Sequence, residues 1–189
     1  MNLPATLRRL GLGKLALALW HRPAGRIRDS IRHGGPWEER RTERGRREME
    51  AAAHTLPVPP AAAGPSVELH LLTGHRFWYQ TAFCLWTFAR HADRPLAPVI
   101  YDDGSLTAEF RAPLVRLFPA VRFVSLVETA ARLEEHLPAA RFPALRERWL
   151  NYPNIRKLTD PHLGRSGWKL VLDSDLLFFR RPGFLLDWL

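Results

Sequence analysis

From residue 67 to the C-terminus, short apolar runs alternate with longer segments whose apolar residues recur at helical spacing. Four apolar runs that end in polar or turn residues predict strands, at residues 67–72, 98–101, 121–124 and 168–172. The segments between them predict helices, at residues 77–91, 106–118, 127–136 and 142–159. Apolar strands that alternate with helices are typical of a parallel sheet covered on both faces. The pattern therefore predicts an α/β fold with a Rossmann-like, mostly parallel sheet and helices on both faces.

The N-terminal third of the chain has a different pattern. Residues 1–35 are basic and carry leucines, and residues 36–54 predict a charged, solvated helix whose opposite charges stand three and four residues apart. Residues 55–66 contain four prolines and a glycine, which prevent regular structure. We therefore expect a basic helical extension over residues 1–54, a linker over 55–66 and the α/β domain over 67–189.

The beginning of the chain contains a leucine-rich stretch from Leu15 to Trp20 that partly resembles a signal peptide. Because this stretch is short, follows Lys14 and precedes no small-residue cleavage site, we expect neither a cleaved signal nor a spanning helix. The single cysteine, Cys84, excludes a disulfide within one chain and is expected to be a buried hydrophobic side chain. These features predict a cytoplasmic protein, and leave open a peripheral contact with the anionic inner face of a membrane.

The net charge of +9 belongs mostly to the N-terminal part, because residues 1–65 hold 12 basic and 6 acidic side chains. Such an excess can attract nucleic acid or an anionic membrane. The arginines are interleaved with glutamates and lack a patterned set of aromatic residues, which favours a solvated helix. We therefore expect no specific nucleic-acid partner, and keep a basic protein that binds nucleic acid or a membrane surface as a rival hypothesis.

Polar residues follow three of the predicted strands at the point where each strand ends. They are Thr73-Gly74, Asp102-Asp103-Gly104-Ser105 and Asp173-Ser174-Asp175. Right-handed crossovers bring the carboxyl ends of parallel strands to one edge of the sheet, where ligands bind. We therefore expect these three groups to form one site.

Asp173 and Asp175 carry the strongest chemical signal in the chain. In an extended segment, residues two apart face the same side, so two carboxylates would repel each other unless a cation lies between them. Mg²⁺ or Mn²⁺ fits such oxygen ligands and usually shares the phosphates of a substrate. The apolar run 176–179 suggests that the acidic pair lies between two buried segments. The alternative is a pair of exposed turn aspartates.

Two interpretations stay open for Asp102, Asp103 and Gly104. An aspartate here can cap the next helix, and Gly104 permits a positive φ that the turn requires. Alternatively, one of the two aspartates accepts a hydrogen bond from a base or a ribose hydroxyl, and Gly104 lets the ligand approach the backbone.

In this order, the segments 71–74, 100–105 and 169–179 resemble the GT-A glycosyltransferases, the nucleotide-diphospho-sugar transferase fold. The resemblance covers roughly residues 67–189. It implies that Asp175 ligates a divalent metal, Mn²⁺ or Mg²⁺, and that Asp173 contacts the metal or the ribose.

The same resemblance implies further contacts to the nucleotide. Asp102 or Asp103 would contact the nucleoside, and Thr73 and Gly74 would contact the nucleotide at the end of the first strand. Members of the family also place a basic residue near the sugar phosphate. Lys157 or its neighbour Arg156 matches that position, and a solvated helix face is the alternative for both.

By resemblance, the chain would bind a UDP- or GDP-sugar and transfer the sugar to an acceptor that the sequence does not identify. The chain ends at Leu189, soon after Asp175, whereas family members continue through an acceptor-binding half. The expectation is therefore an apparently truncated, donor-binding half in which no residue is assigned as catalytic base. Enzymatic activity of this chain alone stays open, with a catalytically incomplete nucleotide-binding fragment as the alternative.

Overall fold

The computed structural model describes residue 32 and residues 34–188, and divides the chain into two compact units between Glu48 and Met49. Helix α4 (Gly35–Ala53) begins in the first unit and ends in the second. In the first unit, the Glu43 carboxylate pairs with Arg46 and Arg47, three and four residues further on. The charged helix expected over residues 36–54 is therefore present. Residues 1–31, and with them most of the basic leucine-bearing segment, lie outside the described residues.

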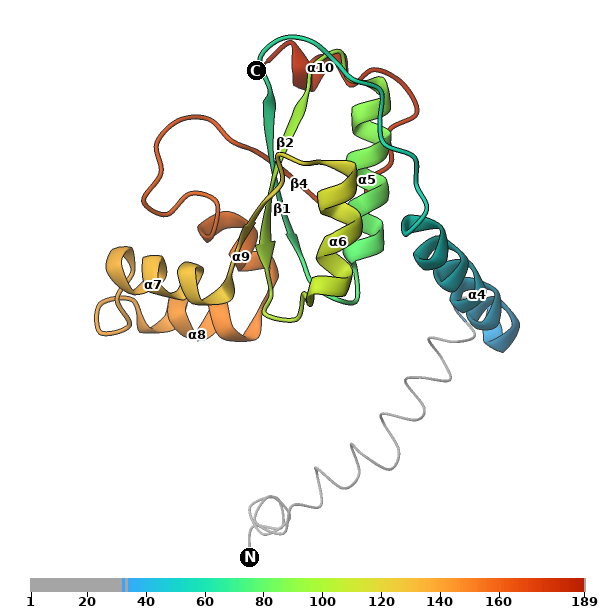
Figure 1. Cartoon of the computed structure of the whole chain (residues 1–189). Coiled ribbons are helices and arrows are strands. Elements are labelled where there is room, and N and C mark those ends of the chain that lie inside the picture. Colours follow the sequence, from blue (N-terminus) through green and yellow to red (C-terminus); the bar gives the residue numbers. More distant parts are fainter. Residues whose placement is uncertain (1–31, 33, 189) are drawn as a thin grey trace, which may run out of the picture. The chain divides into compact units, whose positions relative to one another are not determined.

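The second unit is built on a sheet of four parallel strands (Figure 1). The strands are β1 (Val67–Thr73), β2 (Leu96–Asp102), β3 (Arg122–Val124) and β4 (Leu170–Leu172). Their order is β3-β2-β1-β4, and β1 and β2 pair along their whole length, from Val67–Leu96 to Thr73–Asp102. The predicted Rossmann-like α/β class is thus confirmed for the described residues, as an all-parallel sheet.

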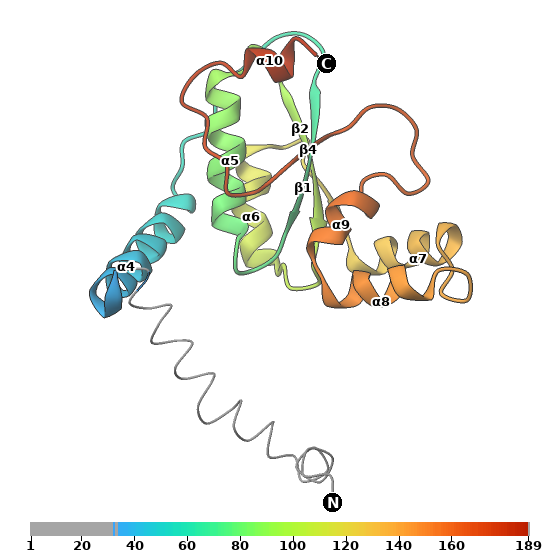
Figure 2. The same cartoon turned by 180° about the vertical axis from the view of Figure 1, so that it is seen from behind.

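Helices cover both faces of this sheet, as the sequence predicted. Helices α5 (Trp78–His91) and α6 (Ala108–Leu117) lie on one side of it. Helices α7 (Leu126–His136), α8 (Pro143–Asn151) and α9 (Asn154–Thr159) lie on the other, as the reverse view in Figure 2 also shows. The short helix α10 (Gly183–Leu186) follows β4. Among the described residues, no helix has the length and apolar character needed to cross a membrane.

The strand order creates a switch in the direction of the chain. From β1 the chain advances through α5 to β2 and through α6 to β3. It then returns through α7, α8 and α9 over the opposite face and adds β4 on the free side of β1. The connections after β1 and β3 therefore lie on opposite faces of the sheet, and a crevice forms between them at the carboxyl edge.

The apolar core lies chiefly between the sheet and helices α5 and α6. From β1 and β2, Leu69, Leu71 and Ile100 belong to this core and are fully buried. The opposite face carries a smaller cluster, made of Val99, Tyr101 and Val124 with Leu72 packed against it. Alternate residues of a strand face opposite sides, so β1 and β2 contribute to both clusters, and Val124 of β3 completes the smaller one.

The proline-rich segment 55–66 has no helix or strand, yet it is attached to the second unit. Leu56 is buried in the main core, and the Pro57 carbonyl accepts a 2.8 Å hydrogen bond from Nε1 of Trp86. Met49 and Ala53, at the end of α4, also pack into that core. The second unit therefore includes residues that the sequence assigned to the extension and the linker.

One expected helix is divided in two. Residues 142–159 were predicted as a single helix, but α8 ends at Asn151 and α9 begins at Asn154. Pro153 is the physical reason, because proline lacks a backbone N–H and disfavours helical backbone at the residue before it. The break gives α9 a direction of its own over the end of β1.

His70 of β1 is fully buried on the face of the sheet that carries the smaller apolar cluster. Its Nδ1 lies 3.3 Å from the Tyr101 hydroxyl, and its Nε2 lies 2.8 Å from Oε1 of Glu68. Removal of the imidazole from water outweighs the attraction of Glu68 and lowers the pKa of His70 from 6.5 to about 4. The imidazole is therefore neutral at pH 7.

We predict that His70 makes the fold less stable as the pH falls from 6.5 to about 4. The unfolded chain binds the proton at the higher pH and the folded chain only at the lower, so acid favours unfolding. The free energy of unfolding should fall by up to about 3 kcal/mol from this group. Urea unfolding across this pH range measures the effect, and His70→Gln should flatten the dependence. An identical pH slope in both proteins would contradict the prediction.

Candidate functional site

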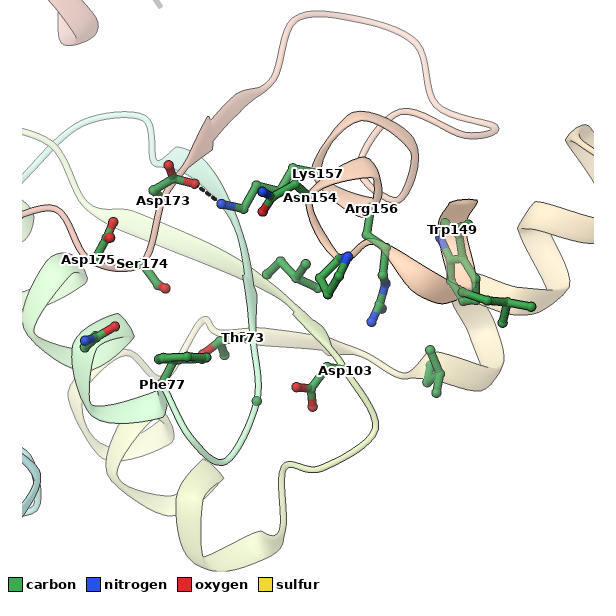
Figure 3. Close-up of a pocket in the computed structure, with 16 residues that line it drawn as sticks. Thr73, Phe77, Asp103, Trp149, Asn154, Arg156, Lys157, Asp173, Ser174 and Asp175 are labelled. Carbon is green, nitrogen blue, oxygen red and sulfur yellow. Dashed lines mark hydrogen bonds and ion pairs between the residues drawn. The ribbon is translucent and has the colours of Figure 1, made fainter. Parts of the chain in front are cut away.

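A cavity of about 520 Å³ lies at the carboxyl edge of the sheet, between the connections that follow β1 and β3 (Figure 3). Residues singled out from the sequence line it, including both basic candidates: Thr73, Gly74, Asp103, Arg156, Lys157, Asp173 and Asp175. Asp102 and Gly104 do not line the cavity. The expectation that the three polar strand ends meet at one edge is therefore correct, although two of the residues serve the fold instead.

Asp102 organises the turn after β2. Its side chain is buried, and Oδ1 accepts hydrogen bonds from the backbone N–H groups of Gly104 at 2.7 Å and Leu106 at 3.1 Å. Its Oδ2 accepts a 2.7 Å hydrogen bond from Arg111. These bonds close the turn and do not cap α6, whose N-cap is Thr107, so the expected helix cap by Asp102 is wrong. The carboxylate of Asp102 is nevertheless engaged by the fold and not presented to the cavity.

Gly104 supports the same turn, since its φ of +98° lies in the left-handed region. The turn presents Asp103 to the cavity, where Oδ1 of Asp103 accepts from the backbone N–H of Ser105 at 3.0 Å and from the Ser105 hydroxyl. A Cβ atom at Gly74 would overlap the Asp103 carboxylate. Glycine at position 74 therefore lets Asp103 lie against the end of β1.

Hydrogen bonds join the loops that follow β1 and β2. The backbone N–H of Asp103 donates to the Thr73 carbonyl at 3.0 Å, and the backbone N–H of His75 donates to the Ser105 hydroxyl at 2.9 Å. These bonds hold Thr73 and Asp103 side by side at the cavity.

Thr73 brings an unpaired polar atom to the site. Its side chain is 3% exposed, and its hydroxyl has no hydrogen-bond partner among the described residues. Buried hydroxyls are ordinarily hydrogen-bonded, so an unpaired one at a cavity indicates a place for a ligand atom or a water. The side chain lies between Asp103 and the 173–175 turn in Figure 3.

The acidic pair differs from its expected conformation. Strand β4 ends at Leu172, and Ser174 and Asp175 form a turn, so the two carboxylates are not on one side of an extended segment. The Asp173 carboxylate is ion-paired with Nζ of Lys157, whereas Asp175 has no ion pair with a described residue. Lys157 is thus a site residue, and the solvated-face alternative is wrong for it.

The apolar run after the acidic pair also differs from expectation. Leu176, Leu177 and Phe179 are 42%, 45% and 82% exposed. Only Phe178 packs inward, with its ring centroid 4.9 Å from that of Phe88 in an edge-on arrangement. Of these four residues, only Phe178 therefore anchors the segment to the core. The reason is that the backbone after Asp175 leaves the sheet instead of continuing along it.

Cys84 of α5 packs against the backbone at the start of the 173–175 turn. Its side chain is fully buried, and its Sγ lies 3.5 Å from the Asp173 carbonyl oxygen. Burial, reinforced by the nearby charges of Asp175 and Asp173, raises the pKa of the thiol to about 12. Cys84 is consequently a buried thiol at neutral pH, as the sequence suggested, and not an activated nucleophile.

Lys157 owes its position to a buried network around its neighbour. The Arg156 guanidinium donates to Oδ2 of Asp160 at 2.8 Å and to the Asp102 carbonyl at 3.1 Å, and it lies 5.0 Å from the centre of the Trp149 ring. Trp149 in turn donates to Oδ1 of Asp160 at 2.8 Å. The network fastens α8 and α9 to the end of β2, so that the next side chain, Lys157, reaches over the end of β4.

Sequence reasoning missed one wall of the cavity. Its members come from helices α5, α7 and α8 and the α8–α9 junction, and include Phe77, Leu126, Trp149, Leu150 and Pro153. The break at Pro153 was the one local signal, since a proline inside a predicted helix marks a place where the backbone turns. The remainder depends on tertiary packing.

Asp173 and Asp175 are the candidate metal ligands of the cavity. Among the described residues, no three side chains of His, Cys, Asp or Glu gather into a metal site. Asp173 and Asp175 supply two carboxylates, and Mg²⁺ or Mn²⁺ is commonly bound by one or two protein carboxylates, waters and substrate phosphates.

Comparisons of the chain with models of protein families, with curated proteins and with solved structures found no match. Function is therefore inferred from the residues of the cavity.

Arg156→Leu and Lys157→Met are adjacent substitutions with different expected effects on stability. Arg156→Leu leaves Asp160 buried without its cation, so the free energy of unfolding should fall by about 3 to 5 kcal/mol. Lys157→Met breaks a partly exposed ion pair and should change it by less than about 1 kcal/mol. Urea unfolding of both variants measures the difference. Equal losses would contradict the separate roles of the two side chains.

Proposed function

We propose that the cavity is the donor site of a metal-dependent glycosyltransferase of the GT-A type, which binds a nucleotide-diphosphate sugar with Mn²⁺ or Mg²⁺. One observation carries the proposal: Asp103, Lys157 and the Asp173–Asp175 turn line a single cavity at the switch point of a parallel sheet. In open parallel sheets, ligands bind at that point. A nucleotide-binding fragment without transferase activity would use the same cavity.

The size and lining of the cavity support a ligand of this class. A volume of about 520 Å³ lies within the range of small-molecule sites. Phe77, Trp149 and Pro153 offer apolar surface for a flat ring, while the acidic turn and Lys157 offer charge. The unpaired Thr73 hydroxyl adds a group that can donate to or accept from the ligand. A nucleotide combines a flat base with a charged diphosphate, and so matches both parts.

Each charged residue has a role in this assignment. Asp175 and Asp173 would hold the cation, Lys157 would contact the diphosphate, and Asp103 would accept a hydrogen bond from the nucleoside. The bound cation would supply Lewis-acid stabilisation of the charge that develops on the leaving diphosphate. The Lys157 ammonium would act on the same charge, because a preorganised cation needs little rearrangement as the bond to the sugar breaks.

We predict that the full chain binds UDP or GDP in the presence of Mn²⁺ and that Asp175→Ala weakens this binding at least about tenfold, since a metal ligand is lost. Isothermal titration calorimetry with each nucleotide, in Mn²⁺ and in EDTA, measures the affinity. Asp187→Ala is the matched control, because it removes the same side chain from an exposed position outside the cavity. Its affinity should equal that of the unmodified chain.

Two results would contradict the proposal. The first is an Asp175→Ala variant that binds nucleotide and Mn²⁺ as tightly as the Asp187→Ala control. The second is an absence of nucleotide binding together with tight, salt-sensitive binding to DNA that survives Asp175→Ala. The second result would favour the basic N-terminal part as the functional region.

A further inference from the structure

The ion pair between Lys157 and Asp173 occupies the place where the proposed cation would bind. Nζ of Lys157 contacts Oδ1 of Asp173, and their side chains are 31% and 55% exposed. Figure 3 shows the lysine crossing from α9 to the end of β4, with Asp175 beyond it in the same turn. In the ligand-free protein, the 173–175 turn is therefore already paired with a positive charge, that of Lys157.

A divalent cation and the Lys157 ammonium compete for the same carboxylate oxygen. A cation that binds alone must displace Lys157 and then lie close to it, and like charges repel most strongly at short distance. A diphosphate removes both costs, because it offers the ammonium a new anionic partner inside the cavity. Lys157 can reach such a partner because Arg156 and Asp160 fix α9 at the cavity edge, while the lysine side chain is flexible.

We infer that Lys157 is an internal counter-ion, held by Asp173 in the free protein and transferred to the diphosphate of the ligand when the cation takes its place. The inference rests on the proposed function and adds a positioning role to it. Nucleotide and cation then each raise the affinity of the site for the other, by the same factor, because binding equilibria at two linked sites are reciprocal.

This role differs from that of a lysine that only contacts phosphate. Loss of a simple phosphate contact weakens nucleotide binding and leaves binding of the cation alone unchanged. Loss of an internal counter-ion weakens nucleotide binding but strengthens binding of the cation alone. A purely structural lysine would alter neither affinity selectively.

The first test observes the ion pair directly. The chain has only three lysines, Lys14, Lys157 and Lys169, so the ammonium region of a ¹⁵N-lysine NMR spectrum is simple. The Lys157→Met variant identifies the signal. We expect that signal to move in Asp173→Asn and to stay in Asp175→Asn. In the unmodified chain it should stay when Mg²⁺ is added alone and move when Mg²⁺ and UDP are added together.

The second test measures the exchange as affinities. In Lys157→Met, Mn²⁺ alone should bind about tenfold more tightly, and UDP in EDTA about tenfold more weakly, within the usual range of coupling between sites. Lys169→Met is the matched control, since that ammonium lies outside the cavity and bonds the Ser166 and Gly167 carbonyls. Asp173→Asn should strengthen UDP binding in EDTA more than Asp175→Asn, because only Asp173→Asn releases the lysine.

The outcomes separate the inference from the proposed function. Failure of the unmodified chain to bind either UDP or GDP under every condition overturns both. Binding of UDP with Mn²⁺ while Lys157→Met leaves the affinity for Mn²⁺ alone unchanged overturns the counter-ion role and leaves the donor site standing. An ammonium signal that is indifferent to Asp173→Asn overturns the role as well. Opposite shifts of the two affinities, with no change in Lys169→Met, support it.

Discussion

The site depends on the buried ion pair between Arg156 and Asp160. Both side chains are almost completely withdrawn from water, a condition that two charges tolerate only when their remaining hydrogen-bonding groups have partners. Trp149 and the Asp102 carbonyl supply those partners, one from α8 and one from the end of β2. Through this network, the consecutive helices α8 and α9 are joined to the end of β2, which is distant from them in sequence. Replacement of either charge would release α9, and with it Lys157.

Neighbouring residues divide the structural and chemical work in this protein. The Asp102 carboxylate is hydrogen-bonded within the turn after β2, while Asp103 faces the cavity. The Arg156 guanidinium is hydrogen-bonded within the buried network, while Lys157 reaches the acidic turn. Consecutive side chains leave the backbone in different directions, so one charge can hold the chain in place while the next remains available. A charged pair at a strand or helix end can thus serve support and chemistry together.

The sequence predicted the strands well because each contains a short apolar run that ends in polar or turn residues, a pattern and length typical of buried strands. It also placed Thr73, Asp103 and Asp173 at one edge, since parallel strands leave no other arrangement. The conformation of the 173–175 turn was wrong, because a strand's end depends on whether a neighbour continues beside it. The exposure of Phe179 and the wall formed by Trp149 depend on packing between distant segments, which local pattern does not record.

Cys84 gives the acidic turn a built-in chemical sensor. It is the single cysteine of the chain, and its sulfur lies directly under the Asp173 carbonyl. A thiol reagent can reach it only after the turn or the adjoining part of α5 has opened, because the side chain is fully buried. The rate of alkylation of the unmodified chain therefore reports how often this corner opens, and a ligand that closes the corner lowers that rate without any engineered label.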